Sequence, residues 1–269
     1  MKRILPFLAV LAFLFGTQGD LRARAETPVD VELVLAVDVS SSMMSDELAL
    51  QRQGYAAAFR SDEVLRAIRY NRYGRIAVTY VEWGASDLHD VIVPWTAVAT
   101  AEDAERIAVI LESARVRNLA RTSISGAIRY SVRAFADNRF QGTRRVIDVS
   151  GDGPNNQGGL VTEARDAAIG EGITINGLPV VIEGRAFGEE TIADLDDYYA
   201  DCVIGGPQAF VMAVKDWNQF AEAVRRKLVV ELSGGQPPVW RASSVVAEPA
   251  GGQFDCGVGE AGWKEMGGN

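Results

Sequence analysis

Short apolar runs alternate with longer amphipathic segments from residue 31 to residue 232. The short runs are rich in Val, Ile and Leu and read as strands at 31–37, 75–83, 89–95, 144–150, 173–182 and 209–214. The longer segments place apolar residues at helical spacing, at 44–59, 102–114, 125–136, 160–171, 189–199 and 216–232. This alternation predicts an α/β protein, doubly wound, with a mostly parallel central sheet and helices on both faces.

One pair of strands breaks the parallel pattern. Residues 75–83 and 89–95 are separated by the turn-forming residues Gly-Ala-Ser-Asp, which leaves too few residues for a crossover helix. Pro94 removes a backbone donor, which suits a strand with one open side. We therefore expect one antiparallel edge strand in the sheet.

The ends of the chain differ from this core. Residues 1–25 begin with Lys2 and Arg3, continue with the apolar stretch 4–15, and end in Ala-Arg-Ala, the layout of a secretory signal peptide. An uncleaved membrane anchor is the alternative, because the distance from Phe15 to Ala25 is long for a signal peptide. No later segment approaches the roughly 20 apolar residues of a membrane span. We expect an exported protein, periplasmic or secreted, with one domain over 29–232 and an extended Gly/Pro-rich tail over 233–269.

Composition restricts the partners. The formal charge is −9, and the first 25 residues contribute +3 from four basic residues and one acidic one, so the remainder carries −12. This charge disfavours nucleic acid or an anionic membrane surface as the main partner. The two cysteines, Cys202 and Cys256, are an even number in a chain predicted to be exported, which favours one disulfide between the domain and the tail. A pair of free buried thiols is the alternative.

Polar residues follow two of the predicted central strands. Asp38, Ser40 and Ser42 form Asp-x-Ser-x-Ser after the first strand, and Asp152 follows the strand 144–150. Carboxyl ends of parallel strands meet at one edge of a sheet, where ligands collect. Two carboxylates facing one crevice repel each other unless a cation lies between them. Carboxylate and hydroxyl oxygens suit a hard divalent ion, most naturally Mg²⁺.

With these motifs in place, residues 29–232 resemble the von Willebrand factor A-type domains, which include the inserted domains of integrins and have a Rossmann-type fold. Their metal-ion-dependent adhesion site uses three loops, matched here by Asp38, Ser40 and Ser42, by Thr122 in "ARTSISGAI", and by Asp152 in "VIDVSGDG". The resemblance implies Mg²⁺, with Mn²⁺ or Ca²⁺ as alternatives. It also implies a partner protein whose acidic group completes the metal's coordination. "VDVSSSM" and "IDVSGDGPNNQG" are similar to motifs of an uncharacterised group of exported bacterial members.

Two positions differ from the family pattern. Arg121 precedes the threonine where glycine is common, and Ser150-Gly151 precede the aspartate where a single hydroxyl residue is usual. Both differences concern loop shape. Each proposed ligand also has a simpler interpretation: Asp38, Ser40, Ser42 and Thr122 as helix caps, and Asp152 as a turn residue.

The loop 151–159, "GDGPNNQGG", has the glycine content of a phosphate cradle but lacks the Gly-Lys-Ser/Thr ending of a P-loop. We interpret it as a wall of the metal crevice, with Asn155 and Asn156 as partner contacts. The chain has a single histidine, His89, and no Gly-x-Ser-x-Gly elbow, so no general base or nucleophile stands out. The leading hypothesis is a non-enzymatic binding module. A metal-dependent hydrolase and a structural domain rigidified by its metal are the alternatives.

Overall fold

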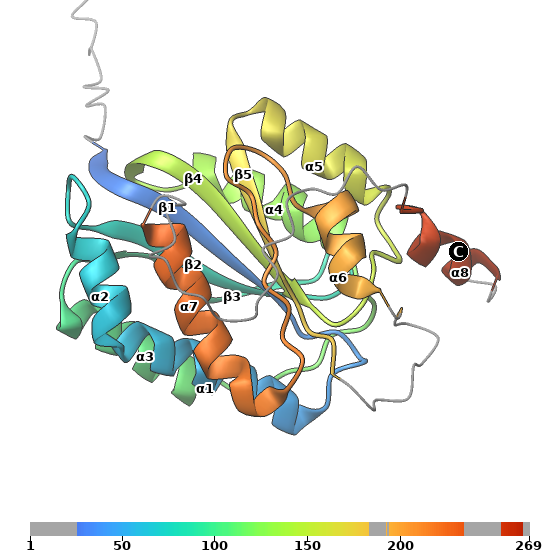
Figure 1. The fold of residues 1–269 in the computed structure, drawn as a ribbon, viewed down its shortest axis with the longest axis horizontal. Coiled ribbons are helices and arrows are strands. Elements are labelled where there is room, and N and C mark those ends of the chain that lie inside the picture. Colours follow the sequence, from blue (N-terminus) through green and yellow to red (C-terminus); the bar gives the residue numbers. More distant parts are fainter. Residues whose placement is uncertain (1–25, 183–191, 193, 234–253, 266–269) are drawn as a thin grey trace, which may run out of the picture.

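The computed structural model describes residues 26–182, 192, 194–233 and 254–265. Five strands form one sheet in the order β3-β2-β1-β4-β5 (Figure 1). They are β1 (Thr27–Asp38), β2 (Ile76–Trp83), β3 (His89–Val98), β4 (Phe140–Gly151) and β5 (Ile173–Pro179). β1 is central and parallel to β2 and β4, β5 is parallel to β4, and β3 is antiparallel to β2 at the edge. The predicted fold class and its antiparallel edge strand are confirmed.

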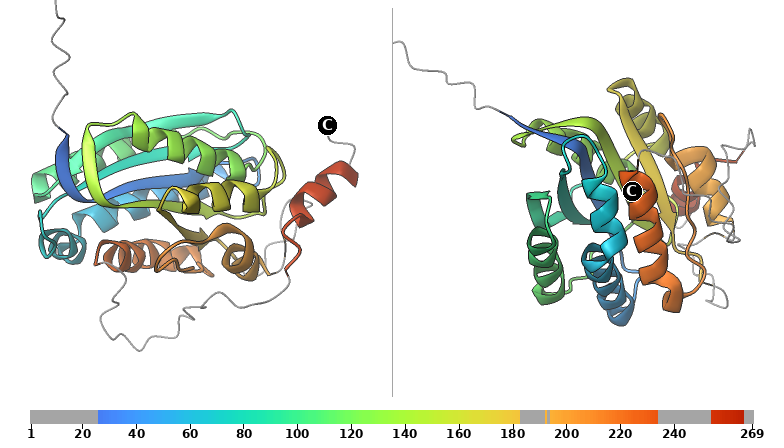
Figure 2. Two further views of the ribbon diagram at one scale, coloured as in Figure 1. Left: turned by 90° about the horizontal axis from the view of Figure 1, so that it is seen from above. Right: turned by 60° about the vertical axis from the view of Figure 1, so that its left-hand side comes forward.

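Helices cover both faces of the sheet (Figure 2). One face carries α1 (Ser45–Arg60), α2 (Asp62–Arg69), α3 (Ala101–Ser113) and α7 (Phe220–Leu232), with α1 between α3 and α7. The other face carries α4 (Ile124–Ala136), α5 (Val161–Gly170), and the short α6 (Leu195–Tyr198) with the π-helical turn η1 (Tyr199–Val203). A 3-10 turn, η2 (Trp217–Gln219), precedes α7, and α8 (Val258–Glu265) follows Cys256.

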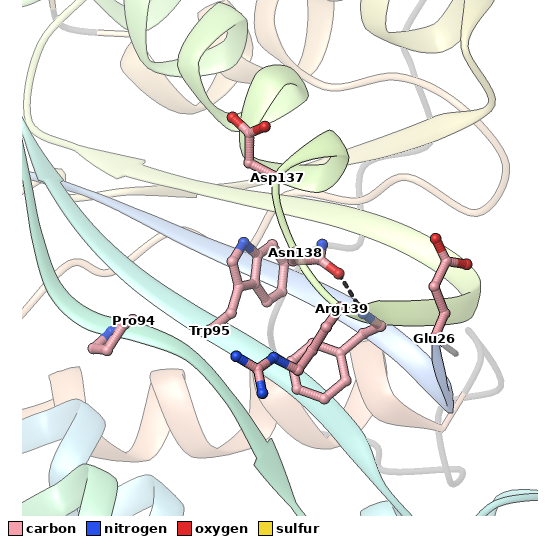
Figure 3. Close-up of a pocket in the computed structure, with 7 residues that line it drawn as sticks. Glu26, Pro94, Trp95, Asp137, Asn138 and Arg139 are labelled. Carbon is pink, nitrogen blue, oxygen red and sulfur yellow. Dashed lines mark hydrogen bonds between the residues drawn. The ribbon is translucent and has the colours of Figure 1, made fainter. Parts of the chain in front are cut away.

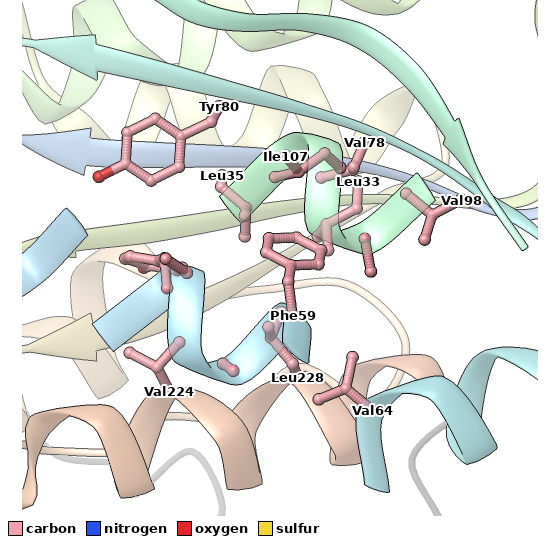
Figure 4. Packing of buried hydrophobic residues seen from close by; sticks show 14 of the residues in the cluster. Leu33, Leu35, Phe59, Val64, Val78, Tyr80, Val98, Ile107, Val224 and Leu228 are labelled. Carbon is pink, nitrogen blue, oxygen red and sulfur yellow. The ribbon is translucent and has the colours of Figure 1, made fainter. Parts of the chain in front are cut away.

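β1 divides two apolar clusters. Its residues Leu33 and Leu35 point into the cluster under α1, α3 and α7, where they meet Phe59 (Figure 4). Val34 and Ala36 point into the cluster under α4 and α5. Because both faces of this strand are covered, its sequence is apolar without alternation.

A buried ionic cluster joins α7 to β4. The ammonium group of Lys227 lies 2.6 Å from Asp148 Oδ1 and also contacts Glu231, and all three side chains are buried. Asn176 Nδ2 donates to Glu231 Oε1 at 2.9 Å. Burial, followed by the charge of Glu231, raises the pKa of Asp148 to about 7, against the opposing effect of Lys227. The cluster therefore depends on one cation between two carboxylates.

Two predicted elements differ from the structure, and one observed helix was not predicted. The expected strand 209–214 runs beside β5 but forms only isolated bridges, Gly177 with Val211 and Val180 with Val214. Pro179, at the end of β5, has no N–H to donate to a continuous ladder. The helix expected over 189–199 is reduced to α6 and η1 where it is described, and 183–191 and 193 lie outside the described residues. The helix α2 was not predicted.

The expectation of an extended tail is wrong for its described part, because residues 258–265 form α8. The helix is docked on the domain, and an added Cβ on Gly259 would lie 2.1 Å from the carbonyl oxygen of Asn155. Phe254 packs edge-on against Tyr198, with ring centroids 5.7 Å apart. Gly259 has no side chain, and this permits α8 to pack closely against the domain. The sequence alone predicts an irregular tail at this glycine. The predicted signal peptide, 1–25, lies outside the described residues.

A disulfide anchors this segment. Cys202 in η1 is bonded to Cys256, with Cα atoms 5.5 Å apart and a sequence separation of 54. Among the described residues, no helix combines the length and apolarity that a membrane span requires.

Replacing both cysteines, Cys202→Ser with Cys256→Ser, should lower the free energy of unfolding by about 4 kcal/mol, since the bond closes a long loop in the unfolded chain. Chemical denaturation measures the change. Reductant should bring the wild type to the stability of the double variant and leave the variant unchanged. Equal midpoints for the two oxidised proteins would show that the bond contributes nothing.

Candidate metal site

Three loops meet at the edge of the sheet where β1 and β4 end. The parallel register pairs Val37 with Ser150, which places Asp38 and Asp152 at the same edge. The first loop (39–44) follows β1, the second (114–123) precedes α4, and the third (152–160) follows β4. Leu119 N donates to Val39 O at 2.7 Å, and Asn118 Nδ2 donates to Ser40 O at 3.0 Å, so the second loop is fastened to the first.

Four of the five predicted ligands form one hydrogen-bonded chain. Ser40 N donates to Asp38 Oδ1 at 2.7 Å, and the Ser40 and Ser42 hydroxyls are 3.0 Å apart. Ser42 Oγ donates to Asp152 Oδ1 at 2.7 Å. Asp38, Ser40 and Asp152 are buried and Ser42 is half-buried, whereas Ser41 is exposed. The Asp-x-Ser-x-Ser motif thus turns its alternate residues toward the aspartate of the third loop.

Thr122, the fifth predicted ligand, is buried in the second loop. Its backbone N–H donates to Asn156 Oδ1 at 3.1 Å, and its carbonyl accepts from Asn156 N at 2.9 Å. The cap of α4 is Ser123, whose hydroxyl accepts from Gly126 N at 3.2 Å. The capping interpretation of Thr122 is therefore wrong, and its own hydroxyl has no hydrogen-bond partner.

The side chains of Asp38, Ser40 and Ser42 do not cap a helix either. α1 begins after Met44, whose N–H donates to Glu47 Oε2 at 2.8 Å. The side chains of Asp38, Ser40 and Ser42 lie before this turn and are used in the chain of contacts that ends at Asp152.

The electrostatics of the site favour a cation. Burial, followed by the nearby charge of Asp152, raises the pKa of Asp38 well above its usual range. Asp38 Oδ2 and Thr122 Oγ1 are both enclosed and without a hydrogen-bond partner. Buried polar atoms are rarely left in this state, and a hard divalent cation satisfies such oxygens. The described residues contain no cluster of three His, Cys, Asp or Glu side chains, so a cation here would depend on hydroxyls as well as carboxylates. The donor set fits Mg²⁺.

Backbone conformation accounts for both departures from the family pattern. Arg121 has φ of 67°, in the left-handed region that favours glycine, so the loop keeps the shape that glycine would give it. Gly151 ends β4, and a Cβ there would lie 2.8 Å from Asp38 Oδ2 and 2.9 Å from the Tyr199 hydroxyl. A side chain at position 151 would collide with the site.

Asn155 and Asn156, which we expected to contact a partner, are both buried and bonded within the chain in this structure, so that contact stays a prediction. Asn155 Nδ2 donates to Gly159 O at 2.9 Å and to Glu260 Oε1 at 2.6 Å, and its Oδ1 accepts from Ser125 N. Asn156 fastens the third loop to Thr122. Both asparagines shape the site from within, and sequence alone gave no sign that Glu260 would be their neighbour.

A cavity of about 480 Å³ lies elsewhere, at the amino ends of β1 and β4 (Figure 3). Trp95 and Asn138 line it, and their polar atoms are bonded to the chain: Trp95 Nε1 donates to Ala134 O, and Asn138 Oδ1 accepts from Phe140 N. The cavity holds none of the five predicted ligands.

Comparison with solved structures places the fold. The chain is similar to a von Willebrand factor type A protein from Catenulispora acidiphila, with 15% identity, a TM-score of 0.54, and coverage of 77% of this chain and 43% of that one. It is also similar to proximal thread matrix protein 1 of the mussel byssus, in a structure with a zinc-occupied MIDAS motif. The identity is 16% and the TM-score 0.53, with coverage of 77% of this chain and 49% of that one. A third similar structure is the pilus adhesin SpaC from Lactobacillus rhamnosus GG. Its identity is 11% and its TM-score 0.53, with coverage of 76% of this chain and 31% of that one.

The chain spans less than half the length of each of these proteins, and at these identities the likeness shows the fold alone. A search of curated proteins found no match. The model of a family described as "Protein of unknown function (DUF1194)" matches residues 28–236. With a von Willebrand factor A-type fold and this match across most of its length, the chain belongs to the DUF1194 family.

Proposed function

We propose that the protein is an exported, Mg²⁺-dependent protein-binding module that captures an acidic group of a partner protein. The observation that carries the proposal is the pair of buried, unpartnered oxygens, Asp38 Oδ2 and Thr122 Oγ1, beside the buried Asp152. Neither Asp38 Oδ2 nor Thr122 Oγ1 has a hydrogen-bond partner, and a divalent cation would supply one.

Asp38, Ser40, Ser42, Thr122 and Asp152 would hold the cation. When bound, it supplies a positive centre that attracts a further carboxylate. The chain's own residues hold the loops in place: Ser42 joins the first loop to Asp152, and Asn156 joins the second loop to the third. The proposal of a metal site is supported by the mussel protein, which has a similar fold and a zinc-occupied MIDAS motif.

Local charge supports an acidic partner. The protein as a whole is acidic, yet the second loop contains three arginines and no acidic residue. Arg115 and Arg117 are exposed there, although Arg117 is paired with Asp90 at 3.0 Å. An approaching carboxylate would meet positive charge on this side of the site.

A binding role, as opposed to catalysis, is proposed because no general base or nucleophile stands out beyond the proposed metal ligands. His89, the single histidine, lies in β3 and stacks on Tyr130 with ring centroids 4.5 Å apart. Export is supported by the signal-peptide layout of residues 1–25 and by the disulfide.

Calorimetric titration with MgCl₂ tests the metal. The wild type should bind one ion, and Thr122→Val, which replaces a hydroxyl by a methyl group of similar size, should bind at least about 10-fold more weakly, as changes to a metal site generally do. Ser113→Val, an exposed hydroxyl at the end of α3, is the matched control and should bind like the wild type. No heat of binding and no change in melting temperature in the wild type would contradict the proposal.

Affinity capture from an envelope fraction tests the partner. A true partner should be retained with Mg²⁺, released by chelator, and lost with the Thr122→Val protein. Replacing the partner's contacting Glu or Asp by the matching amide should abolish retention. A partner retained equally with chelator would favour the structural role for the metal, and turnover in a phosphatase or esterase panel that chelator abolishes would favour the hydrolase.

A further inference from the structure

Tyr199 has a buried hydroxyl that the fold does not use. The side chain is completely enclosed, in the apolar cluster under α4 and α5, and the hydroxyl has no hydrogen-bond partner. Tyrosine hydroxyls normally find a partner when they are buried. We therefore ask which group the Tyr199 hydroxyl points toward.

Two glycines on neighbouring strands make room for this side chain. A Cβ on Gly177, in β5, would lie 2.8 Å from Tyr199 Cδ1, so the ring rests directly against the backbone of that strand. A Cβ on Gly151, at the end of β4, would lie 2.9 Å from the hydroxyl. The ring thus crosses β5, and its hydroxyl reaches the end of β4.

At that end the hydroxyl faces the metal site. A Cβ added to Gly151 would lie 2.9 Å from Tyr199 Oη and 2.8 Å from Asp38 Oδ2, so the two oxygens are neighbours of one point. Both atoms are buried and both lack a partner, one being a donor and the other an acceptor. The opposite oxygen of Asp38 is already fixed by Ser40 N at 2.7 Å.

The backbone around Tyr199 is fixed. Tyr199 opens the π-helical turn η1, a rare backbone form that is often found at functional sites. The turn follows α6 directly, and Ile204 N donates to Tyr199 O at 3.0 Å across it. Cys202, in the same turn, is bonded to Cys256. The hydroxyl is consequently delivered from a constrained element.

We propose that Tyr199 is a positioning residue of the metal site. Its hydroxyl and Asp38 Oδ2 are not bonded to each other in this structure, and with a cation at the site the hydroxyl would donate a hydrogen bond to that oxygen and orient the carboxylate. A carboxylate oxygen has two lone pairs, so it can accept from Tyr199 and still face a metal. Partners of ligating carboxylates of this kind tune metal affinity without touching the metal. The inference rests on the proposed function, because it requires a cation at Asp38.

Tyr199→Phe removes only the oxygen. Its Mg²⁺ affinity, measured by calorimetric titration, should fall about 10- to 100-fold, the usual effect of losing such a partner. Tyr80→Phe is the matched control, because Tyr80 is also buried with an unpartnered hydroxyl but packs against Tyr55 in the other cluster. Its affinity should equal that of the wild type. Addition of Mg²⁺ should also change the ultraviolet tyrosine absorbance of the wild type and of Tyr80→Phe, and this change should be absent in Tyr199→Phe.

The outcomes separate this inference from the proposed function. Wild-type binding of Mg²⁺ with an unchanged affinity in Tyr199→Phe would overturn the role of Tyr199 and leave the metal site standing. A wild type that binds no Mg²⁺ would overturn both. If Tyr199→Phe does not fold, the Tyr80→Phe protein decides through its absorbance: binding of Mg²⁺ by this protein with no change in tyrosine absorbance would overturn the role of Tyr199.

Discussion

Asp38→Asn should abolish the stabilisation that Mg²⁺ gives to the wild-type protein. A ligand at 100 times its dissociation constant stabilises the folded state by about 2.7 kcal/mol, and this whole gain should vanish in the variant. Asn keeps the shape of the side chain and can still accept from Ser40 N, so the loss would come from charge. Thermal or chemical unfolding with Mg²⁺ and with chelator gives both values.

The same variant should behave differently without metal. Because burial and Asp152 raise the pKa of Asp38, the ionised carboxylate is a cost to the metal-free fold, and Asp38→Asn should be at least as stable as the wild type in chelator. Asp137→Asn, an exposed aspartate at the end of α4, is the control and should keep the full Mg²⁺ response. A variant that still gains stability from Mg²⁺ would show that the cation binds elsewhere.

Lys227→Met should lower the free energy of unfolding by about 3–5 kcal/mol near neutral pH, the usual cost of leaving a buried charge without its partner. Methionine has a similar length, so little packing is lost, but Asp148 and Glu231 then face each other with no cation between them. Urea denaturation measures the loss. Lys215→Met, which removes an exposed lysine 3.7 Å from Asp196, should change stability by less than about 1 kcal/mol.

The cost of Lys227→Met should depend on pH with a definite sign. The pKa of Asp148 is raised to about 7 in the folded protein, so its contribution is present below the unfolded value and is lost as pH rises through about 7. Without Lys227 the folded pKa of Asp148 should rise further, since the lysine opposes the shift. The variant should therefore lose most at pH 8 and least near pH 4. An equal loss at both values would place the effect in packing.

The sequence predicted the five strands of the sheet and brought most of the candidate site residues to one edge of it, for a physical reason. β1 is covered on both faces, so its run of apolar residues identifies it as a central strand. The residues that follow a parallel strand lie at the carboxyl-terminal edge of the sheet, where ligands bind. Asp152 follows β4 in the same way, whereas Thr122 was identified through the resemblance to von Willebrand factor A-type domains. The strand-end residues are local or follow from parallel pairing, and a single sequence contains both kinds of information.

The remaining features depend on contacts between distant segments. Gly259 of α8 lies against the backbone carbonyl of Asn155, and the Asn155 side chain donates to Glu260 of the same helix, a contact across more than 100 positions of sequence. The segment 209–214 has the composition of a strand, yet a single proline in its neighbour interrupts the pairing. The direction of the Tyr199 hydroxyl depends on Gly151 and Gly177, two glycines in separate strands. No local pattern records such pairs.

The bond between Cys202 and Cys256 makes a covalent ring out of the segment between them, 54 positions in sequence. A protease that cuts one peptide bond inside this ring produces two fragments that stay joined. The nicked protein would migrate as an intact chain on a denaturing gel without reductant and as two bands with it. Cleavage within the ring would thus leave Asn155 and Glu260 on one covalently connected molecule, and release of α8 from the metal loops would require a reductant in addition to the protease.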